Sequence, residues 1–176
     1  MDLGEARENL AHVAVMRMSC RCGSTARGVI GAKYTNLAMS LIDCLPHQPP
    51  MRLLEEVAEL RHGESAIGRR HAHADDFYFQ GHFPGRPVVP AVILVELLAQ
   101  TGGIAVAAPL PGEPGRAIEL RVAAIGPFKF PAAAGPGETL EARAHVAGRL
   151  GALFKIEGTV TADGIVVATG SLTLAG

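Results

Sequence analysis

Two ionisable side chains that flank an expected helix start suit acid–base chemistry. His82 lies in a loop rich in glycine and proline, and Glu96 lies in the apolar segment that follows Pro90. Proline suits the first turn of a helix, because its backbone angle is already set and the N–H that it lacks needs no partner there. The sequence therefore predicts a loop that carries a base and, from Pro90 onward, a helix that carries an acid.

The helix expected from Pro90 is apolar on nearly every face, so we expect it to be buried on all sides. Glu96 and Gln100 lie four residues apart and share one face, which predicts a polar seam along this helix. Small residues follow, among them Gly102 and Gly103, and they permit close approach by a neighbouring backbone. The segment 109–115 is rich in proline and glycine and ends the helix.

Strand patterns lie on both sides of the helix. Before it, two strands are expected at 53–60 and 65–73, around a turn at 62–64. After it, four strands are expected at 117–130, 139–148, 152–161 and 165–174, with a hairpin turn at Asp163-Gly164. Two strands, a long buried helix and four more antiparallel strands predict an α+β fold in which a sheet wraps around the helix.

Residues 1–40 differ from the rest of the chain, and we interpret them as an N-terminal extension that precedes a folded domain at 41–176. Within the extension, 5–18 fit a short helix, whereas 19–31 are rich in serine, glycine and arginine and have no clear periodicity. Basic residues dominate between Glu8 and Asp43, but the acidic first turn argues against a transit peptide. Met39 is an alternative start of translation.

Composition narrows the possible classes of protein. The chain has 176 residues and a formal net charge of −1, which gives no argument for nucleic-acid or membrane binding. Cys20, Cys22 and Cys44 are an odd set that does not suit a disulfide framework or a four-ligand zinc site. No segment reaches the length of a membrane span. We therefore expect a cytoplasmic protein without a metal.

The segment 81–100 closely resembles the signature of the FabZ-type (3R)-3-hydroxyacyl-acyl-carrier-protein dehydratases, which have the hotdog fold. The matching residues are Gly-His-Phe-Pro-Gly-Arg-Pro at 81–87, Val-Pro at 89–90 and Glu-Leu-Leu-Ala-Gln at 96–100. The resemblance extends over roughly 41–174, from Leu-Pro-His at 45–47 to Phe-Lys-Phe-Pro at 128–131. Ala91 stands where the family usually has glycine, and Gln48 and Pro49 also depart from its pattern. We expect these differences to affect substrate range more than the reaction.

The resemblance implies a lyase that dehydrates 3-hydroxyacyl thioesters to trans-2-enoyl thioesters in fatty acid or related acyl-chain biosynthesis, a part of lipid metabolism. The substrate would be carried on the phosphopantetheine of an acyl carrier protein, and no further cofactor is implied. The resemblance also implies a homodimer with shared active sites, in which His82 and Glu96 of one site come from different subunits. A higher oligomer is left open.

The reaction needs three roles, and the sequence offers groups for each. Histidine is suited to remove the proton next to the carbonyl, so His82 is the expected base. Backbone N–H groups around Gly85 and Ala91 are the expected carbonyl donors at the helix start. Glu96, in an apolar environment that favours its uncharged form, is the expected hydroxyl-side acid or water-positioning group. Phe83 and Gln100 are further expected substrate-binding residues.

A purely structural role is the alternative for each of these residues. His82 is otherwise a solvated loop histidine, and Glu96 is otherwise a carboxylate held by a core arginine such as Arg121. Gln100 fits a bond to the backbone or to Glu96 as well as a contact with substrate. The remaining ionisable residues are interpreted as ordinary, including His47, Asp75 and Asp76, whereas Arg69, Arg70, Arg86, Arg121 and Lys129 are candidate contacts for an acidic carrier.

Two other functions remain open from the sequence. One is a hotdog thioesterase, which would cleave the thioester instead of dehydrating the acyl chain. The other is a non-catalytic hotdog module that binds acyl carrier protein.

Overall fold

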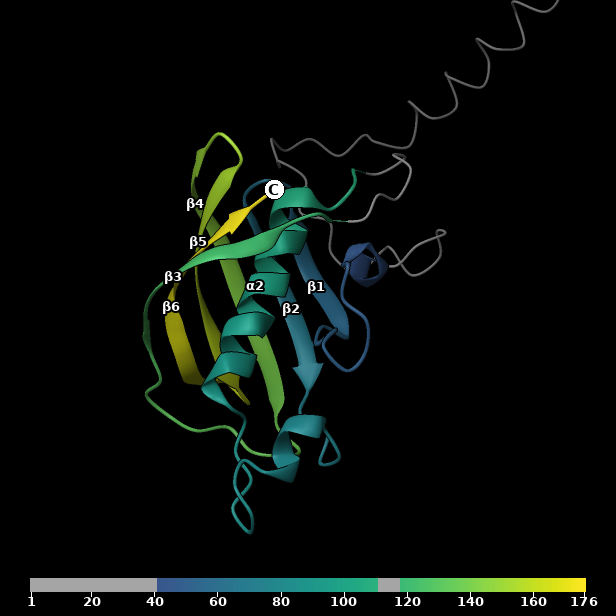
Figure 1. Cartoon of the computed structure of the whole chain (residues 1–176), viewed down its shortest axis with the longest axis vertical. Helices are drawn as coiled ribbons and strands as arrows, with labels where there is room; N and C mark the ends of the chain where they lie inside the picture. Colours follow the sequence, from purple (N-terminus) through teal and green to yellow (C-terminus); the bar gives the residue numbers. More distant parts are fainter. Residues whose placement is uncertain (1–40, 111–117) are drawn as a thin grey trace, which may run out of the picture.

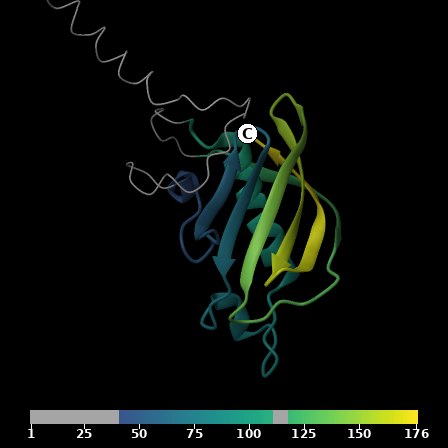
Figure 2. The ribbon, with the colours of Figure 1, turned by 180° about the vertical axis from the view of Figure 1, so that it is seen from behind.

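A computed structural model describes residues 41–110 and 118–176 of the chain. One long helix, α2, lies across the concave side of a curved antiparallel sheet (Figure 1; Figure 2 shows the opposite side). The helix is Ala91–Ala107, and two short 3-10 helices are η1, Leu41–Cys44, and η2, Phe77–Gln80. The strands are β1 Glu56–Arg61, β2 Ser65–His71, β3 Arg121–Lys129, β4 Thr139–Leu150, β5 Leu153–Ala162 and β6 Ile165–Ala175.

The six strands form one sheet in the order β1-β2-β4-β5-β6-β3. The register pairs Ala66 of β2 with Ala144 of β4, and the β5–β6 hairpin closes at the predicted turn. Asp163 and Gly164 both have positive φ there, 44° and 87°, which is the conformation that an Asp-Gly hairpin turn requires. The predicted α+β architecture is therefore confirmed.

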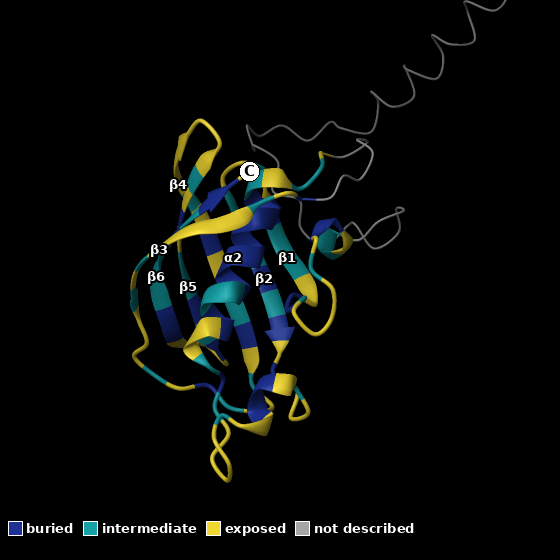
Figure 3. Ribbon diagram, viewed as in Figure 1, coloured by how far each residue is buried: buried dark blue, intermediate teal, exposed yellow. Residues whose placement is uncertain are grey.

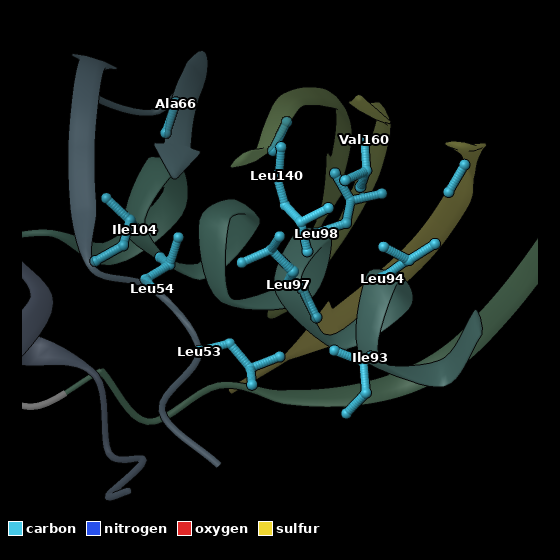
Figure 4. Close-up of a cluster of buried hydrophobic side chains, with 14 of the residues drawn as sticks. Leu53, Leu54, Ala66, Ile93, Leu94, Leu97, Leu98, Ile104, Leu140 and Val160 are labelled. Carbon is cyan, nitrogen blue, oxygen red and sulfur yellow. The ribbon is translucent and has the colours of Figure 1, made fainter. Parts of the chain in front are cut away.

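The core lies between α2 and the sheet, and Leu97 and Leu98 are at its centre (Figure 4). The sheet presents small residues where the helix crosses it. A Cβ at Gly158 would lie 2.7 Å from Leu98 Cδ1, and one at Gly68 would lie 2.6 Å from Thr101 Oγ1. Glycine at both positions lets the helix approach the sheet closely.

The first turn of α2 departs from the expectation of burial on all sides. Val92 is 72% exposed, and the exposed patches at this end of the helix are visible in Figure 3. The prediction was wrong here because the sheet of a single chain covers only one side of the helix. The first turn of α2 therefore leaves apolar surface uncovered within a single chain.

The edge strand β3 also leaves apolar side chains exposed. It begins at Arg121, later than predicted, and Ile125 on it is 63% exposed. The strand has one neighbour, β6, so its other edge has no strand partner within the described part of the chain. A nine-residue edge strand with exposed apolar side chains is a template for pairing with another strand.

A buried ion pair secures the segment between β2 and the His82 loop. Arg70 Nη2 donates to Asp76 Oδ1, Arg70 Nη1 donates to the Leu53 carbonyl at 3.0 Å, and the Tyr78 hydroxyl donates to Asp76 Oδ2 at 2.6 Å. Burial, followed by the bond to Asp76, raises the pKa of Tyr78 to about 12. The interpretation of Asp76 as a solvated loop carboxylate was wrong, because its side chain is the partner of a buried guanidinium.

The expectations for the extension at 1–40 lie outside the described residues. These are the helix at 5–18, the irregular segment at 19–31 and the alternative start at Met39.

Candidate active site

Glu96 has polar partners from its own helix and from a distant segment. Its Oε1 lies 3.2 Å from His47 Nε2 and accepts a hydrogen bond of 2.9 Å from Gln100 Nε2. The side chains of His47 and Glu96 are 31% and 23% exposed, so this contact is only partly open to solvent. The carboxyl group is therefore held by a histidine and an amide rather than surrounded by apolar side chains alone.

Gln100 ties this contact to the segment that enters β1. Its Oε1 accepts hydrogen bonds from the backbone N–H groups of Leu53 at 2.9 Å and Leu54 at 3.3 Å. Its Nε2 donates to the Met51 carbonyl at 2.7 Å as well as to Glu96. Because Gln100 is 2% exposed and its amide groups already have partners, its geometry favours the role of orienting Glu96.

A cavity of about 280 Å³ adjoins Glu96. Its lining combines the His47–Glu96–Gln100 cluster with apolar side chains from α2, from the segment 118–122 and from β6. Arg121 also lines it, yet the Glu96 partners in the described structure are His47 and Gln100 rather than Arg121. A larger groove of about 750 Å³ near Arg70 and His73 contains neither His82 nor Glu96. The smaller cavity is therefore the one that adjoins the predicted site residue Glu96.

The loop that carries His82 is closed by its own backbone. Phe83 and Arg86 face each other across a turn, with the Arg86 N–H donating to the Phe83 carbonyl at 3.0 Å. Pro84 and Gly85 occupy the middle of this turn, and Gly85 has a φ of 76°, a conformation that glycine adopts at no cost. The Val88 N–H donates to the His82 carbonyl at 2.8 Å, which fixes the base of the loop.

The same loop fixes which nitrogen of His82 is available. His82 Nδ1 lies 3.0 Å from the Val88 carbonyl oxygen. Because a carbonyl can only accept, Nδ1 carries the hydrogen and Nε2 of the neutral ring is left with its lone pair. His82 also stacks on Phe83, with ring centroids 4.1 Å apart, and Phe83 is 55% exposed. The ring is thus positioned as a base whose free nitrogen is Nε2.

The structure brings some predicted site residues together and leaves others apart. Glu96 and Gln100 are in contact, whereas His82, Phe83, Gly85 and Ala91 do not line the cavity at Glu96. The His82 loop projects beyond the N-terminal end of α2 (Figure 1). In the described part of the chain, the N–H groups of Gly85 and Ala91 have no hydrogen-bond partner, so both remain available as donors.

Sequence reasoning missed His47, which it interpreted as ordinary. The contact with Glu96 joins segments far apart in the chain, and a tertiary contact of this kind has no periodicity that reveals it. The available signal was its place beside Pro46 and the Pro49-Pro50 pair, which keep this stretch extended. His47 Nδ1 is buried and has no hydrogen-bond partner in the described structure.

Two of the arginines that we expected to contact an acidic carrier form ion pairs with carboxylates of this chain instead. Arg69 Nε donates to Glu141 Oε2 at 2.8 Å, a bond that lowers the pKa of Glu141, and Arg70 is buried against Asp76. Arg86, Arg121 and Lys129 are exposed, and none of them has an ion-pair partner among the described residues.

The described residues show neither a metal cluster nor a membrane-spanning helix. Within residues 41–110 and 118–176, no cluster of three or more histidine, cysteine, aspartate or glutamate side chains is arranged to hold a metal ion. Among the helices of the described ranges, none combines the length and the apolar character needed to cross a membrane.

Relatives of this chain are named FabZ dehydratases, the family that the segment 81–100 resembles. The 3-hydroxyacyl-acyl-carrier-protein dehydratase FabZ of Herpetosiphon aurantiacus is 35% identical over 135 residues, which cover 77% of this chain and 94% of that protein. FabZ of Roseiflexus castenholzii is 36% identical over 131 residues, which cover 74% of this chain and 90% of that protein. The sequence model of the FabA-like domain family matches residues 45–171.

Comparison with solved structures agrees at the level of the fold. The dehydratase heterocomplex ApeI:P from Xenorhabdus doucetiae aligns with a TM-score of 0.57 and 19% identity, over 79% of this chain and 91% of that one. At this identity the likeness speaks for the hotdog fold alone, which is confirmed. From the domain match and the FabZ relatives together, the chain belongs to the FabA-like family and, within it, to the FabZ dehydratases.

Proposed function

We propose that this chain removes water from 3-hydroxyacyl thioesters carried on acyl carrier protein, as a hydro-lyase of fatty acid or related acyl-chain biosynthesis. The observation that carries the proposal is the relation to FabZ over most of the chain, in which His82 is the candidate base and Glu96 the candidate acid. His82 presents a free Nε2, and Glu96 faces a cavity with apolar walls. The reaction itself needs a base and an acid, together with donors for the carbonyl oxygen.

Each step of the proposed reaction is assigned to a chemical group of this chain. His82 Nε2 takes the proton from the carbon next to the thioester carbonyl. The N–H groups of Gly85 and Ala91 donate to the carbonyl oxygen as negative charge develops there, aided by the dipole at the start of α2. Glu96 delivers a proton to the departing hydroxyl or positions the water that forms. Gln100 and Phe83 border these groups, Gln100 by orienting Glu96 and Phe83 by stacking on His82.

The complete site forms between two chains. His82 and the Glu96 cavity do not share a lining within one chain, and both β3 and the first turn of α2 leave apolar side chains exposed. Pairing of β3 with the same strand of a second copy would cover Ile125 and bring the His82 loop of one subunit toward Glu96 of the other. The protein then works as a homodimer with two shared sites.

The acyl carrier protein docks through charge. Arg86 on the loop tip, together with Arg121 and Lys129 on β3, is exposed and has no acidic partner in the described structure. An acidic carrier would meet these cations, of which Arg121 lines the cavity, since complementary charge steers association. We place this activity in the cytoplasm, because the cysteines do not suit an oxidising compartment.

A single assay tests the function. The full chain is mixed with a 3-hydroxyacyl thioester, and two signals are followed: absorbance of the enoyl product and release of free thiol. Dehydration predicts enoyl absorbance without free thiol. Thiol release would identify a thioesterase instead, and binding without either product would identify a non-catalytic carrier-binding module. The FabZ names of the relatives favour the first outcome.

A further inference from the structure

The cavity at Glu96 continues along α2 for nearly two helical turns. Glu96, Ala99, Gln100 and Gly103 all line it, and their spacing places them along one side of the helix. Gly103 lies seven positions after Glu96, which corresponds to about 10 Å along the helix axis. The cavity therefore has a polar end at Glu96 and a second end at Gly103.

The walls beyond Glu96 are suited to a hydrocarbon chain. The apolar lining also includes side chains from the segment after the helix and from β6, namely Ile118, Leu120 and Leu174, and Ile118 is the one that lies next to Gly103. Gln100 adds little polarity, because its amide groups are already bonded to Leu53, Leu54, Met51 and Glu96. Since Glu96 acts at the hydroxyl-bearing carbon, the rest of the acyl chain has this apolar end of the cavity to occupy.

Gly103 differs from its neighbour Gly102 in the space around it. Among the described residues, a Cβ built at Gly103 meets one heavy atom within 4 Å, Ile118 Cγ2 at 3.8 Å. A Cβ built at Gly102 would lie 3.0 Å from Ile156 Cγ2 and 3.1 Å from Ile156 Cγ1. Glycine at 102 is therefore required by packing against β5, whereas glycine at 103 leaves room that the cavity occupies.

We propose that Gly103 sets the length of acyl chain that the enzyme accepts, by leaving the far end of the cavity unfilled. The inference rests on the proposed function and deepens it. A side chain at 103 would take up space that the terminal carbons of a long substrate need. Each buried methylene changes binding roughly fourfold, so loss of one carbon's space should be measurable.

The test is a series of full-length variants, Gly103→Ala and Gly103→Leu, assayed with four-, eight- and twelve-carbon 3-hydroxyacyl thioesters. The measured quantity is the ratio of kcat/KM for the twelve-carbon substrate to that for the four-carbon substrate. We expect this ratio to fall about fourfold with alanine and more than tenfold with leucine. Alanine fits the available space, so Gly103→Ala keeps the test valid if the leucine variant does not fold.

Two matched variants separate chain-length selection from damage to packing. Gly102→Ala should lower the melting temperature, because its methyl group meets Ile156, while the chain-length ratio stays the same. Gly148→Ala is exposed on β4 with open space around it and should change neither quantity.

An equal loss at all chain lengths in the Gly103 variants, or no change in the ratio, would overturn the inference. A wild-type protein that dehydrates none of the three substrates would instead overturn the proposed function.

Discussion

Glu96 lies in the second turn of a helix and is held by side chains from two segments, whereas His82 lies in a loop closed by its own backbone. The Glu96 side is complete within one chain, because His47 and Gln100 contact its carboxyl group and a cavity adjoins it. On the His82 side, Nε2 is free and Phe83 is exposed, and neither residue lines that cavity. His82 and Glu96 therefore belong to two separate regions of one chain, and the proposed dimer is what would bring His82 of one chain to Glu96 of another.

The largest expected effect comes from removing the base. His82→Ala should reduce kcat by about a thousandfold or more, since no other histidine occupies this loop. The fold should survive, because the ring makes one backbone hydrogen bond and lies at the surface end of the loop. Steady-state dehydration assays and circular dichroism measure the two quantities.

His145→Ala, at an exposed position on β4, is the control and should keep full activity. Near-normal turnover in His82→Ala would remove this residue from the mechanism.

The second effect concerns how the His82 loop is anchored. Asp76→Ala would remove the nearer carboxylate partner of buried Arg70 and leave, among the described residues, only Glu55, whose Oε1 lies 3.5 Å from Arg70 Nη1, so we expect a cost of up to about 3–5 kcal/mol. We expect the midpoint of urea unfolding to fall accordingly. Asp75→Ala, at an exposed neighbouring position, should change stability by less than about 0.5 kcal/mol. Equal stability in the two variants would mean that the pair does not secure this segment.

The smallest expected effect comes from removing His47, the partner of Glu96. His47→Ala should lower kcat about tenfold with a smaller change in KM, because it removes a partner of Glu96 at the wall of the cavity. His47→Gln should restore part of the rate, since its amide can also donate to Glu96. In a Glu96→Gln background, the loss caused by His47→Ala should disappear, as a double-mutant cycle would measure.

A surface pair provides the control for His47. His73 Nε2 lies 2.9 Å from Glu55 Oε1, and both side chains are at least 40% exposed. His73→Ala should therefore leave kcat unchanged. An additive loss for His47→Ala and Glu96→Gln would show that His47 does not act through Glu96.

Local patterns predicted the elements well, because the forces that shape them act over short stretches. The Asp163-Gly164 turn, the start of α2 beside Pro90 and the face shared by Glu96 and Gln100 all follow from neighbouring residues. The carbonyl donors at the helix start were predicted for the same reason and stay a prediction of function.

The remaining features depend on tertiary contacts or on surfaces left uncovered. His47 meets Glu96 only because the segment before β1 packs against α2, and Asp76 meets Arg70 only through the turn after β2. The exposure of Val92 could not be predicted from an apolar pattern, because the pattern does not say whether the same chain or a partner covers it. The sequence of this chain therefore does not predict its uncovered surfaces or its buried ion pair.

The most direct test of the shared site is a mixed dimer. His82→Ala and Glu96→Gln subunits carry different affinity tags, are coexpressed, and the heterodimer is isolated through both tags. If the two residues of one site come from different chains, the heterodimer holds one intact site and one site without either group. It should then show about half of the wild-type activity, far above either parent homodimer. A heterodimer no more active than its parents would contradict the account, because each chain would then contain its own complete site.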